Sequence, residues 1–274
     1  MSTVELPGGA SIWFRRQGRG APLLQIHGSA FGHRNFEKMT PLMISHAEVI
    51  DFDLPGYGES HGGEAMATGM TAIAELIFEF IKALKIPRID IHGTSFGAML
   101  ALTLAARHPE VINRLILSCF LARYDAAARM MRSTWKRAAR DSGMQAVADL
   151  TSVAGFARGF YDLPHAEKQL ASMREAFSRT TADAFIAGTE TIERTDLTPL
   201  LSGIEAPTLL LAGAEDNMTP FALALSGVGM SRIKDLLPNC ELSVLPECGH
   251  YLVLEQPAIA AKLIGDFLAR PRLR

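Results

Sequence analysis

The chain has 274 residues, of which 48% are hydrophobic, and its formal net charge is −2 at pH 7. This length and apolar content suffice for one large core, or for a core with a small insertion. The near-neutral charge argues against nucleic acid or an anionic membrane surface as a partner.

The N-terminal sequence "MSTVELPGGASIWFRR" lacks the basic start and apolar run of a secretory signal. The longest helix-like apolar run, residues 96–106, is too short to span a bilayer. Three cysteines, an odd number, argue against a disulfide framework, and no cysteine or histidine spacing is that of a metal site. No phosphate- or dinucleotide-binding glycine loop is found. We therefore expect a soluble, cytoplasmic protein that uses no metal or organic cofactor.

Predicted strands and helices alternate along most of the chain. The first residues are expected to form a hairpin around the Pro7-Gly8-Gly9 turn. Further strands, read from short apolar runs, are expected at 21–28, 47–53, 88–92, 114–120, 206–216 and 241–246. Helices are expected at 35–45, 71–84, 96–107, 221–237 and 257–269. This alternation predicts parallel βαβ units, and hence a mostly parallel sheet covered by helices on both faces.

Residues 121–200 interrupt the alternation. They read as several helices without strands and are rich in Met, Ala, Phe and Arg. We therefore expect a core of residues 1–120 and 201–274, with residues 121–200 inserted after the sixth strand as a helical lid, or cap. Such an insertion would lie over the carboxyl ends of the strands, the edge of an open α/β sheet at which ligands bind.

A serine stands between two glycines where a predicted strand becomes a helix. Residues 93–97 read Gly-Thr-Ser-Phe-Gly. So sharp a turn forces its central residue to a positive φ, and side chains two positions away would collide with neighbouring backbone, so glycine is needed there. The hydroxyl of Ser95 is then lifted clear of the sheet, beside the N-terminus of the helix. In isolation the pattern fits a glycine-rich loop without chemistry equally well.

Five segments in sequence order resemble motifs of the α/β-hydrolase family, and together they span essentially the full chain. They are "IHGSAFG" at 26–32, "DFDLPGYGES" at 51–60, the serine turn at 93–97, "LLLAGAEDNMTP" at 209–220 and "PECGHYLVLEQP" at 246–257. The resemblance implies an α/β-hydrolase fold, a mostly parallel central sheet flanked by helices with an inserted helical lid. It also implies a nucleophile, a base, an acid and an oxyanion hole.

The resemblance places the catalytic groups at positions that match these motifs. Ser95 is the candidate nucleophile, which is inert near neutral pH until a base takes its proton. Among eight histidines, His250 follows a late strand, where the family's base lies in the chain order serine, acid, histidine. Asp216 is the candidate acid that orients the imidazole. Glu215 and Asp125 are the alternatives for the acid, and Asp216 is preferred to both.

The oxyanion hole needs two backbone N–H groups aimed at the developing negative charge. We expect one from Phe96, directly after the nucleophile, and one from Ser29, with Ala30 as the alternative. The hydroxyl of Ser29 either adds a third donor or lines the wall. The glycines of the second motif are interpreted as turn formers, and no chemistry is expected of its Asp53.

The first part of the expected lid is strongly basic. Residues 128–140 carry five positive charges and no negative one, which on a helix predicts a solvated face. The alternative is that Arg129, Arg132 or Arg140 reaches inward to hold a substrate carboxylate. Large apolar lid side chains more often serve packing, but they also suggest a largely apolar acyl pocket. These side chains are Met130, Phe156, Phe160, Tyr161, Met173 and Phe177.

Within the superfamily, residues 93–117 resemble most the meta-cleavage-product hydrolases, and also the enol-lactonases and small carboxylesterases. A serine at the turn argues against haloalkane dehalogenases and epoxide hydrolases, which use Asp there. The first hypothesis is a serine hydrolase acting on a small, largely apolar ester, lactone, thioester or vinylogous C–C substrate. The alternatives are a cofactor-free oxygenase or lyase on the same scaffold, and a low-turnover ligand-binding receptor. The sequence leaves the physiological substrate and a homo-oligomeric state open.

Overall fold

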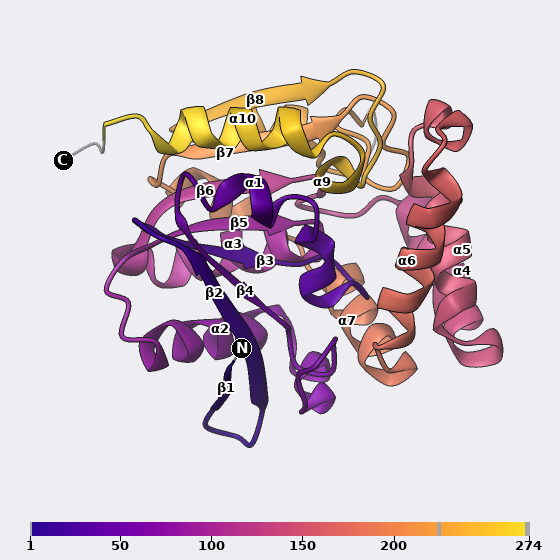
Figure 1. Cartoon of the computed structure of the whole chain (residues 1–274), viewed down its shortest axis with the longest axis horizontal. Coiled ribbons are helices and arrows are strands. Elements are labelled where there is room, and N and C mark those ends of the chain that lie inside the picture. Colours follow the sequence, from indigo (N-terminus) through magenta and orange to yellow (C-terminus); the bar gives the residue numbers. More distant parts are fainter. Residues whose placement is uncertain (1, 224–225, 272–274) are drawn as a thin grey trace.

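A computed structural model describes residues 2–223 and 226–271 of the protein. These residues form one sheet of eight strands in the order β1-β2-β4-β3-β5-β6-β7-β8 (Figure 1). The strands are β1 (Ser2–Glu5), β2 (Ser11–Gly18), β3 (Pro22–Ile26), β4 (Glu48–Phe52), β5 (Ile89–Thr94), β6 (Ile112–Ser118), β7 (Thr208–Gly213) and β8 (Cys240–Leu245). The β1–β2 and β2–β4 pairs are antiparallel, and the five remaining pairs are parallel. The prediction of a mostly parallel sheet that begins with a hairpin is thereby confirmed.

Helices cover both faces of the sheet. Consecutive side chains of a strand point to opposite faces, so the apolar residues of a buried strand need a helical layer on each side. In β3, Leu23 joins the apolar cluster that contains Met43 and Ile264, whereas Leu24 joins the cluster that contains Ile77 and Met99. Figure 1 shows α2 and α10 on opposite sides of the strands. The α-helices are α1 (Thr40–Met43), α2 (Met70–Ala83), α3 (Phe96–Arg107), α4 (Ala126–Ser142), α5 (Met144–Gly155), α6 (Ala166–Ser178), α7 (Ala182–Arg194), α8 (Met230–Leu236), α9 (Leu252–Glu255) and α10 (Pro257–Leu268).

Four of these helices, α4 to α7, lie between β6 and β7 in the chain. Figure 1 shows them as a group beside the carboxyl ends of the central strands. Many of their inner side chains, such as Trp135, Met173 and Phe185, belong to the same apolar cluster as Leu211 of β7 and Tyr251. None of the helices in the described part of the chain is long and apolar enough to cross a membrane.

Two predicted helices are much shorter in the structure. In place of a helix at 35–45 there is a 3-10 turn, Gly32–Phe36, followed by the four-residue α1. Pro41 lies where a continuous helix would need a backbone N–H, which explains the interruption. The helix expected at 221–237 is reduced to α8, because Val228 instead pairs with Arg123 as an isolated β-bridge. Residues 224–225 of that prediction lie outside the described residues.

Candidate active site

The predicted serine turn is present at the end of β5. Ser95 has φ 52° and ψ −114° and directly precedes α3. A Cβ atom at Gly97 would lie 2.0 Å from the carbonyl oxygen of Ile26, and one at Gly93 would lie 2.4 Å from that of Gly97. Both positions therefore require glycine for the steric reason that the sequence suggested.

His250 and Asp216 form a buried hydrogen bond at the carboxyl edge of the sheet. The imidazole Nδ1 lies 2.9 Å from the carboxylate Oδ2. The other oxygen, Oδ1, accepts hydrogen bonds of 2.8 Å from the backbone N–H groups of Met218 and Thr219. The Thr219 hydroxyl donates to Oδ2 at 2.6 Å, a contact that the sequence analysis missed. Burial opposes ionisation of Asp216, but His250 and these hydrogen bonds hold its pKa below the usual value. The Asp216 carboxylate is thus an ionised acceptor.

The alternative acids are engaged elsewhere. Glu215 accepts a 2.9 Å hydrogen bond from the backbone N–H of Arg158. Asp125 caps the N-terminus of α4 by accepting from the N–H of Ala128, also at 2.9 Å. Neither carboxylate is bonded to His250 in the described structure, so the preference for Asp216 agrees with the geometry.

Ser95 and His250 line one pocket. Ser29 lines the same wall, and Gly28 is so close that a Cβ atom there would lie 3.4 Å from Cβ of Ser95. Phe96 is the first residue of α3, so its N–H has no acceptor within the helix. Among the described residues we find no acceptor for the N–H of Ser29 or of Phe96, and the Ser29 hydroxyl is buried without a partner.

The loop of residues 27–33, which we call the oxyanion loop, is held to the core at both ends. The His27 ring bridges it to the next loop, because Nδ1 lies 2.7 Å from the carbonyl oxygen of Gly28 and Nε2 accepts from Leu54 N–H at 2.9 Å. The side-chain Oδ1 of Asn35 accepts from the N–H of Gly28 at 2.8 Å and from the hydroxyl of Thr94 at 2.6 Å. Asn35 therefore ties the oxyanion loop to the serine turn.

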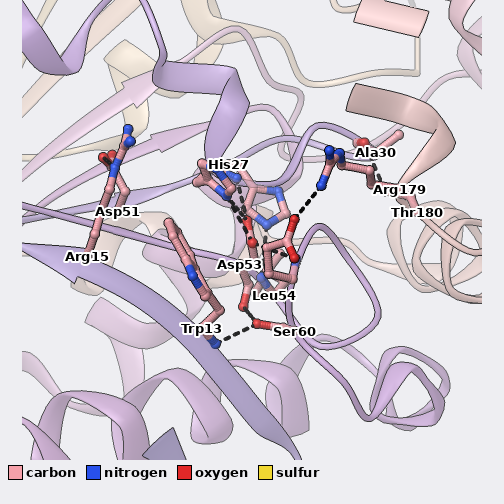
Figure 2. A network of polar contacts seen from close by, with 12 residues as sticks. Trp13, Arg15, His27, Ala30, Asp51, Asp53, Leu54, Ser60, Arg179 and Thr180 are labelled. Carbon is pink, nitrogen blue, oxygen red and sulfur yellow. Dashed lines mark hydrogen bonds and ion pairs between the residues drawn. The ribbon is translucent and has the colours of Figure 1, made fainter. Parts of the chain in front are cut away.

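Asp53 fixes the far end of the oxyanion loop (Figure 2). Its buried carboxylate accepts hydrogen bonds from the backbone N–H groups of His33 at 2.5 Å and Glu59 at 2.8 Å, and lies 3.0 Å from the His33 ring. Burial opposes ionisation, but these hydrogen bonds hold the pKa of Asp53 below its usual value. The Ser60 hydroxyl links the Asp53 carbonyl to Trp13. None of these residues lines the pocket, in agreement with an architectural role.

The helices α4 to α7 supply much of the pocket's remaining wall. Of the six apolar side chains expected there, only Phe177 lines it; Trp135 and Phe185 line it in addition. The expectation was wrong for Met130 and Tyr161, which are 66% and 41% exposed. Three others are buried in packing away from the pocket, which is the role the sequence favoured for such side chains: Phe156, Phe160 and Met173.

Arg132 lies in the pocket wall and not on a solvated face. It is 2% exposed and shares the buried side of α4 with Trp135, whereas Arg129 and Arg140 are exposed. Its Nη2 donates to the hydroxyl of Tyr124 at 2.6 Å, and its guanidinium lies 4.6 Å from the Tyr124 ring and 5.4 Å from the Trp135 ring. Its Nε is buried without an acceptor, and no carboxylate of the described residues forms an ion pair with it.

The loop that carries His250 also contacts residues 121–200, which contain α4 to α7 and are called the helical segment below. The backbone N–H of His250 donates to the carbonyl of Gly155, the last residue of α5, at 2.6 Å. The carboxylate of Glu255 accepts from Gly249 N–H at 3.1 Å and from Ala157 N–H at 2.9 Å. Burial raises the pKa of Glu255 to about 7.

One potential metal-ligand cluster includes two members of the candidate site. The ligand atoms of Cys119, Asp216 and His250 lie within 4.8 Å of one another. However, Nδ1 of His250 and Oδ2 of Asp216 are hydrogen-bonded to each other. Burial also raises the pKa of the Cys119 thiol well above its usual value. A metal would need the thiolate. The donor set therefore fits a hydrogen-bonded acid–base pair better than a metal site, and the three cysteines are free thiols.

A mostly parallel sheet with a serine on a strained strand-to-helix turn and a His–Asp pair at the carboxyl edge defines an α/β hydrolase. A family model described as the alpha/beta hydrolase fold matches residues 21–257, so the chain belongs to this family. The predicted fold class and family are confirmed, and the protein is an α/β-fold hydrolase that acts on small substrates.

Several proteins with known names are similar to this chain over most of its length. A 2-hydroxymuconate semialdehyde hydrolase of Pseudomonas sp. (strain CF600) is 29% identical over 263 residues, which cover 92% of this chain and 88% of that protein. A pimeloyl-[acyl-carrier protein] methyl ester esterase of Aromatoleum aromaticum is 27% identical and covers 89% and 96% of the two chains. The crystal structure of the enol-lactonase from Burkholderia xenovorans LB400 matches with a TM-score of 0.87 at 22% identity, over 96% of this chain and 98% of that one.

Proposed function

We propose that the protein is a serine hydrolase in which Ser95 is the nucleophile, His250 the base and Asp216 the acid. The observation that carries the proposal is the Asp216–His250 hydrogen bond at the wall of the pocket that also holds Ser95. A buried, ionised carboxylate at Nδ1 keeps that nitrogen protonated, so Nε2 is left to accept the serine proton.

In the proposed reaction, Oγ of Ser95 attacks the substrate carbonyl while Nε2 of His250 takes the hydroxyl proton. The oxyanion accepts hydrogen bonds from the N–H groups of Ser29 and Phe96, which are free to donate. His250 then passes the proton to the leaving group. Water hydrolyses the acyl-Ser95 ester with His250 again as base, which regenerates the free hydroxyl.

Residues 121–200 are proposed to be a lid that selects the substrate. Their side chains give the pocket an apolar wall with a single cation, Arg132, among its lining residues. A buried guanidinium without a carboxylate partner is costly unless an anion pairs with it. We therefore propose a small, largely apolar ester, lactone or C–C substrate that carries a carboxylate away from the scissile bond. The similar proteins described above, a semialdehyde hydrolase, a methyl ester esterase and an enol-lactonase, are consistent with this range of substrates.

The nucleophile is tested with a fluorophosphonate probe and a short p-nitrophenyl ester. We expect a covalent adduct on Ser95, and a loss of turnover of at least about 10³-fold in folded Ser95→Ala. The control is Ser45→Ala, an exposed serine, which should keep the wild-type rate. Wild-type turnover by Ser95→Ala would overturn the proposal. Oxygen consumption, or ligand binding without turnover, in a protein that the probe does not label would favour the oxygenase or receptor alternative.

The role of Arg132 is tested with two esters of equal size, one with a distal carboxylate and one with a carboxamide in its place. Arg132→Gln should lower kcat/KM for the carboxylate ester about 10- to 100-fold, because a hydrogen bond to a charged group is lost. The carboxamide ester should change by less than about threefold, and the control Arg129→Gln should affect neither. Equal losses on both esters would mean that Arg132 serves packing.

A further inference from the structure

The helical segment makes one hydrogen bond to the oxyanion loop in the described structure. The hydroxyl of Thr180, between α6 and α7, donates to the carbonyl of Ala30 at 2.9 Å (Figure 2). Thr180 is 4% exposed and Ala30 is fully buried. The other hydrogen bonds that hold this loop come from the core, through His27, Asn35 and Asp53.

Ala30 has a backbone conformation that needs support. Its φ is 73°, in the left-handed region that residues with a Cβ atom rarely adopt. It directly follows Ser29, whose N–H is the proposed oxyanion donor. Without the Thr180 hydroxyl, the buried Ala30 carbonyl would lose its hydrogen-bond donor. A change in the Ala30 dihedral angles that turned the carbonyl toward a new donor would also displace the adjoining Ser29–Ala30 peptide.

The residue before Thr180 is paired with the loop that carries Asp53. The adjacent Arg179 pairs with Glu59 at 2.5 Å, and the backbone N–H of Glu59 donates to the Asp53 carboxylate (Figure 2). The Arg179 and Glu59 side chains are more than 40% exposed, so this ion pair contributes little on its own. The buried hydroxyl of Thr180 therefore makes the hydrogen bond that couples the α6–α7 junction to the oxyanion loop, beside the edge-to-face contact of Phe31 with Phe177, whose ring centroids lie 4.8 Å apart.

We propose that Thr180 is a positioning residue for catalysis. Its hydroxyl holds the Ala30 carbonyl, and thereby directs the Ser29 N–H toward the substrate oxygen. The oxyanion hole is then complete only when the α6–α7 junction is seated on the core. This inference rests on the proposed function and adds a residue from the helical segment to the machinery of that same site.

A near-isosteric pair of variants separates positioning from lid packing. Thr180→Val removes the hydroxyl and keeps the shape. The matched control is Thr191→Val, because the buried Thr191 of α7 also donates to a core carbonyl, that of Met66 at 3.0 Å, and, like Thr180, lines no part of the pocket. We measure kcat and KM on a p-nitrophenyl ester and the Tm of each variant. Thr180→Ser restores the hydroxyl and serves as the rescue.

Thr180→Val should lower kcat about tenfold, since a misplaced oxyanion donor acts on the transition state, while KM stays within about twofold. Thr191→Val should keep kcat within about twofold, and both should lower Tm by about 2–4 °C. Thr180→Ser should recover most of kcat. If a valine variant does not fold, Thr180→Ala and Thr191→Ala replace the pair.

Equal kcat values for the two valine variants, or a change in KM alone at Thr180→Val, would overturn the positioning role. Ser95→Ala is assayed in parallel. If Ser95→Ala is inactive and Thr180→Val is unaffected, only the positioning role fails. If Ser95→Ala retains turnover, the proposed function fails and the positioning role fails with it.

Discussion

Gly97→Ala tests whether the serine turn is shaped by sterics, as the geometry requires. A Cβ atom at Gly97 would lie 2.0 Å from the carbonyl oxygen and 2.6 Å from the carbonyl carbon of Ile26, and 2.7 Å from the oxygen of His27. All three are backbone atoms, so no side-chain rotation relieves the contact. Separations below 3.0 Å are essentially never seen, so β3 and α3 must move apart by about 1 Å.

The expected magnitude follows from that displacement. Overpacking of this kind costs about 1–3 kcal/mol. At about 2–4 °C per kcal/mol for a chain of this size, Tm should fall by about 2–12 °C. The atoms that move belong to the end of β3 and the start of the oxyanion loop, so Ser29 moves relative to Ser95. A misplacement of about 1 Å at a reacting centre can cost about 10²-fold in rate, and kcat should fall by up to that factor.

The assay combines thermal unfolding with ester hydrolysis. Gly159→Ala is the matched control, because nothing lies within 4 Å of a Cβ atom at that glycine. The reasoning would be refuted if Gly97→Ala matched Gly159→Ala in both Tm and kcat. The larger Gly97→Val should be insoluble or inactive for the same steric reason.

Two further predictions concern the acid and the loop of the base. Asp216→Asn should retain more activity than His250→Ala, because the acid orients the base without taking the proton; near-complete activity of Asp216→Asn in steady-state assays would remove Asp216 from the triad. Glu255 has a pKa raised to about 7 by burial, so its contribution to stability is full below its unfolded value of 4.5 and is lost as pH rises toward and through 7. Urea unfolding at pH 5 and pH 8 should therefore show a larger loss for the wild type than for Glu255→Gln, and parallel losses would contradict the assignment.

The candidate triad could be predicted because short sequence motifs determine where each of its residues lies. The glycines around Ser95 serve one backbone conformation. Asp216 and His250 lie in the loops after β7 and β8, whose carboxyl ends must meet at one edge of a parallel sheet. The alternation of strands and helices likewise predicted the sheet. Order along the chain is enough for such features.

Side-chain partners across the fold could not be predicted in this way. The rotation of α4, which buries Arg132 against Tyr124, is set by tertiary packing, and the charge pattern alone favoured a solvated face. Thr180 is an ordinary threonine in the sequence and acquires its partner, the distant Ala30 carbonyl, only on folding. Thr219 is close to Asp216 in the chain, but its hydroxyl reaches the carboxylate only in the folded turn. The helix expected at 221–237 was lost for a related reason, because a β-bridge to Arg123 outcompeted local helix formation.

The contact between Gly155 and His250 has a consequence for protein engineering. The carbonyl of this α5 residue accepts the His250 N–H, and the approach is so close that a Cβ atom at Gly249 would lie 2.1 Å from it. Grafting residues 121–200 from a relative would therefore replace the backbone carbonyl that supports His250, the proposed base, along with part of the pocket wall. A chimera that keeps Gly155 in place should preserve the rate while it changes the substrate range, whereas a graft chosen only for pocket size should lose turnover on every substrate.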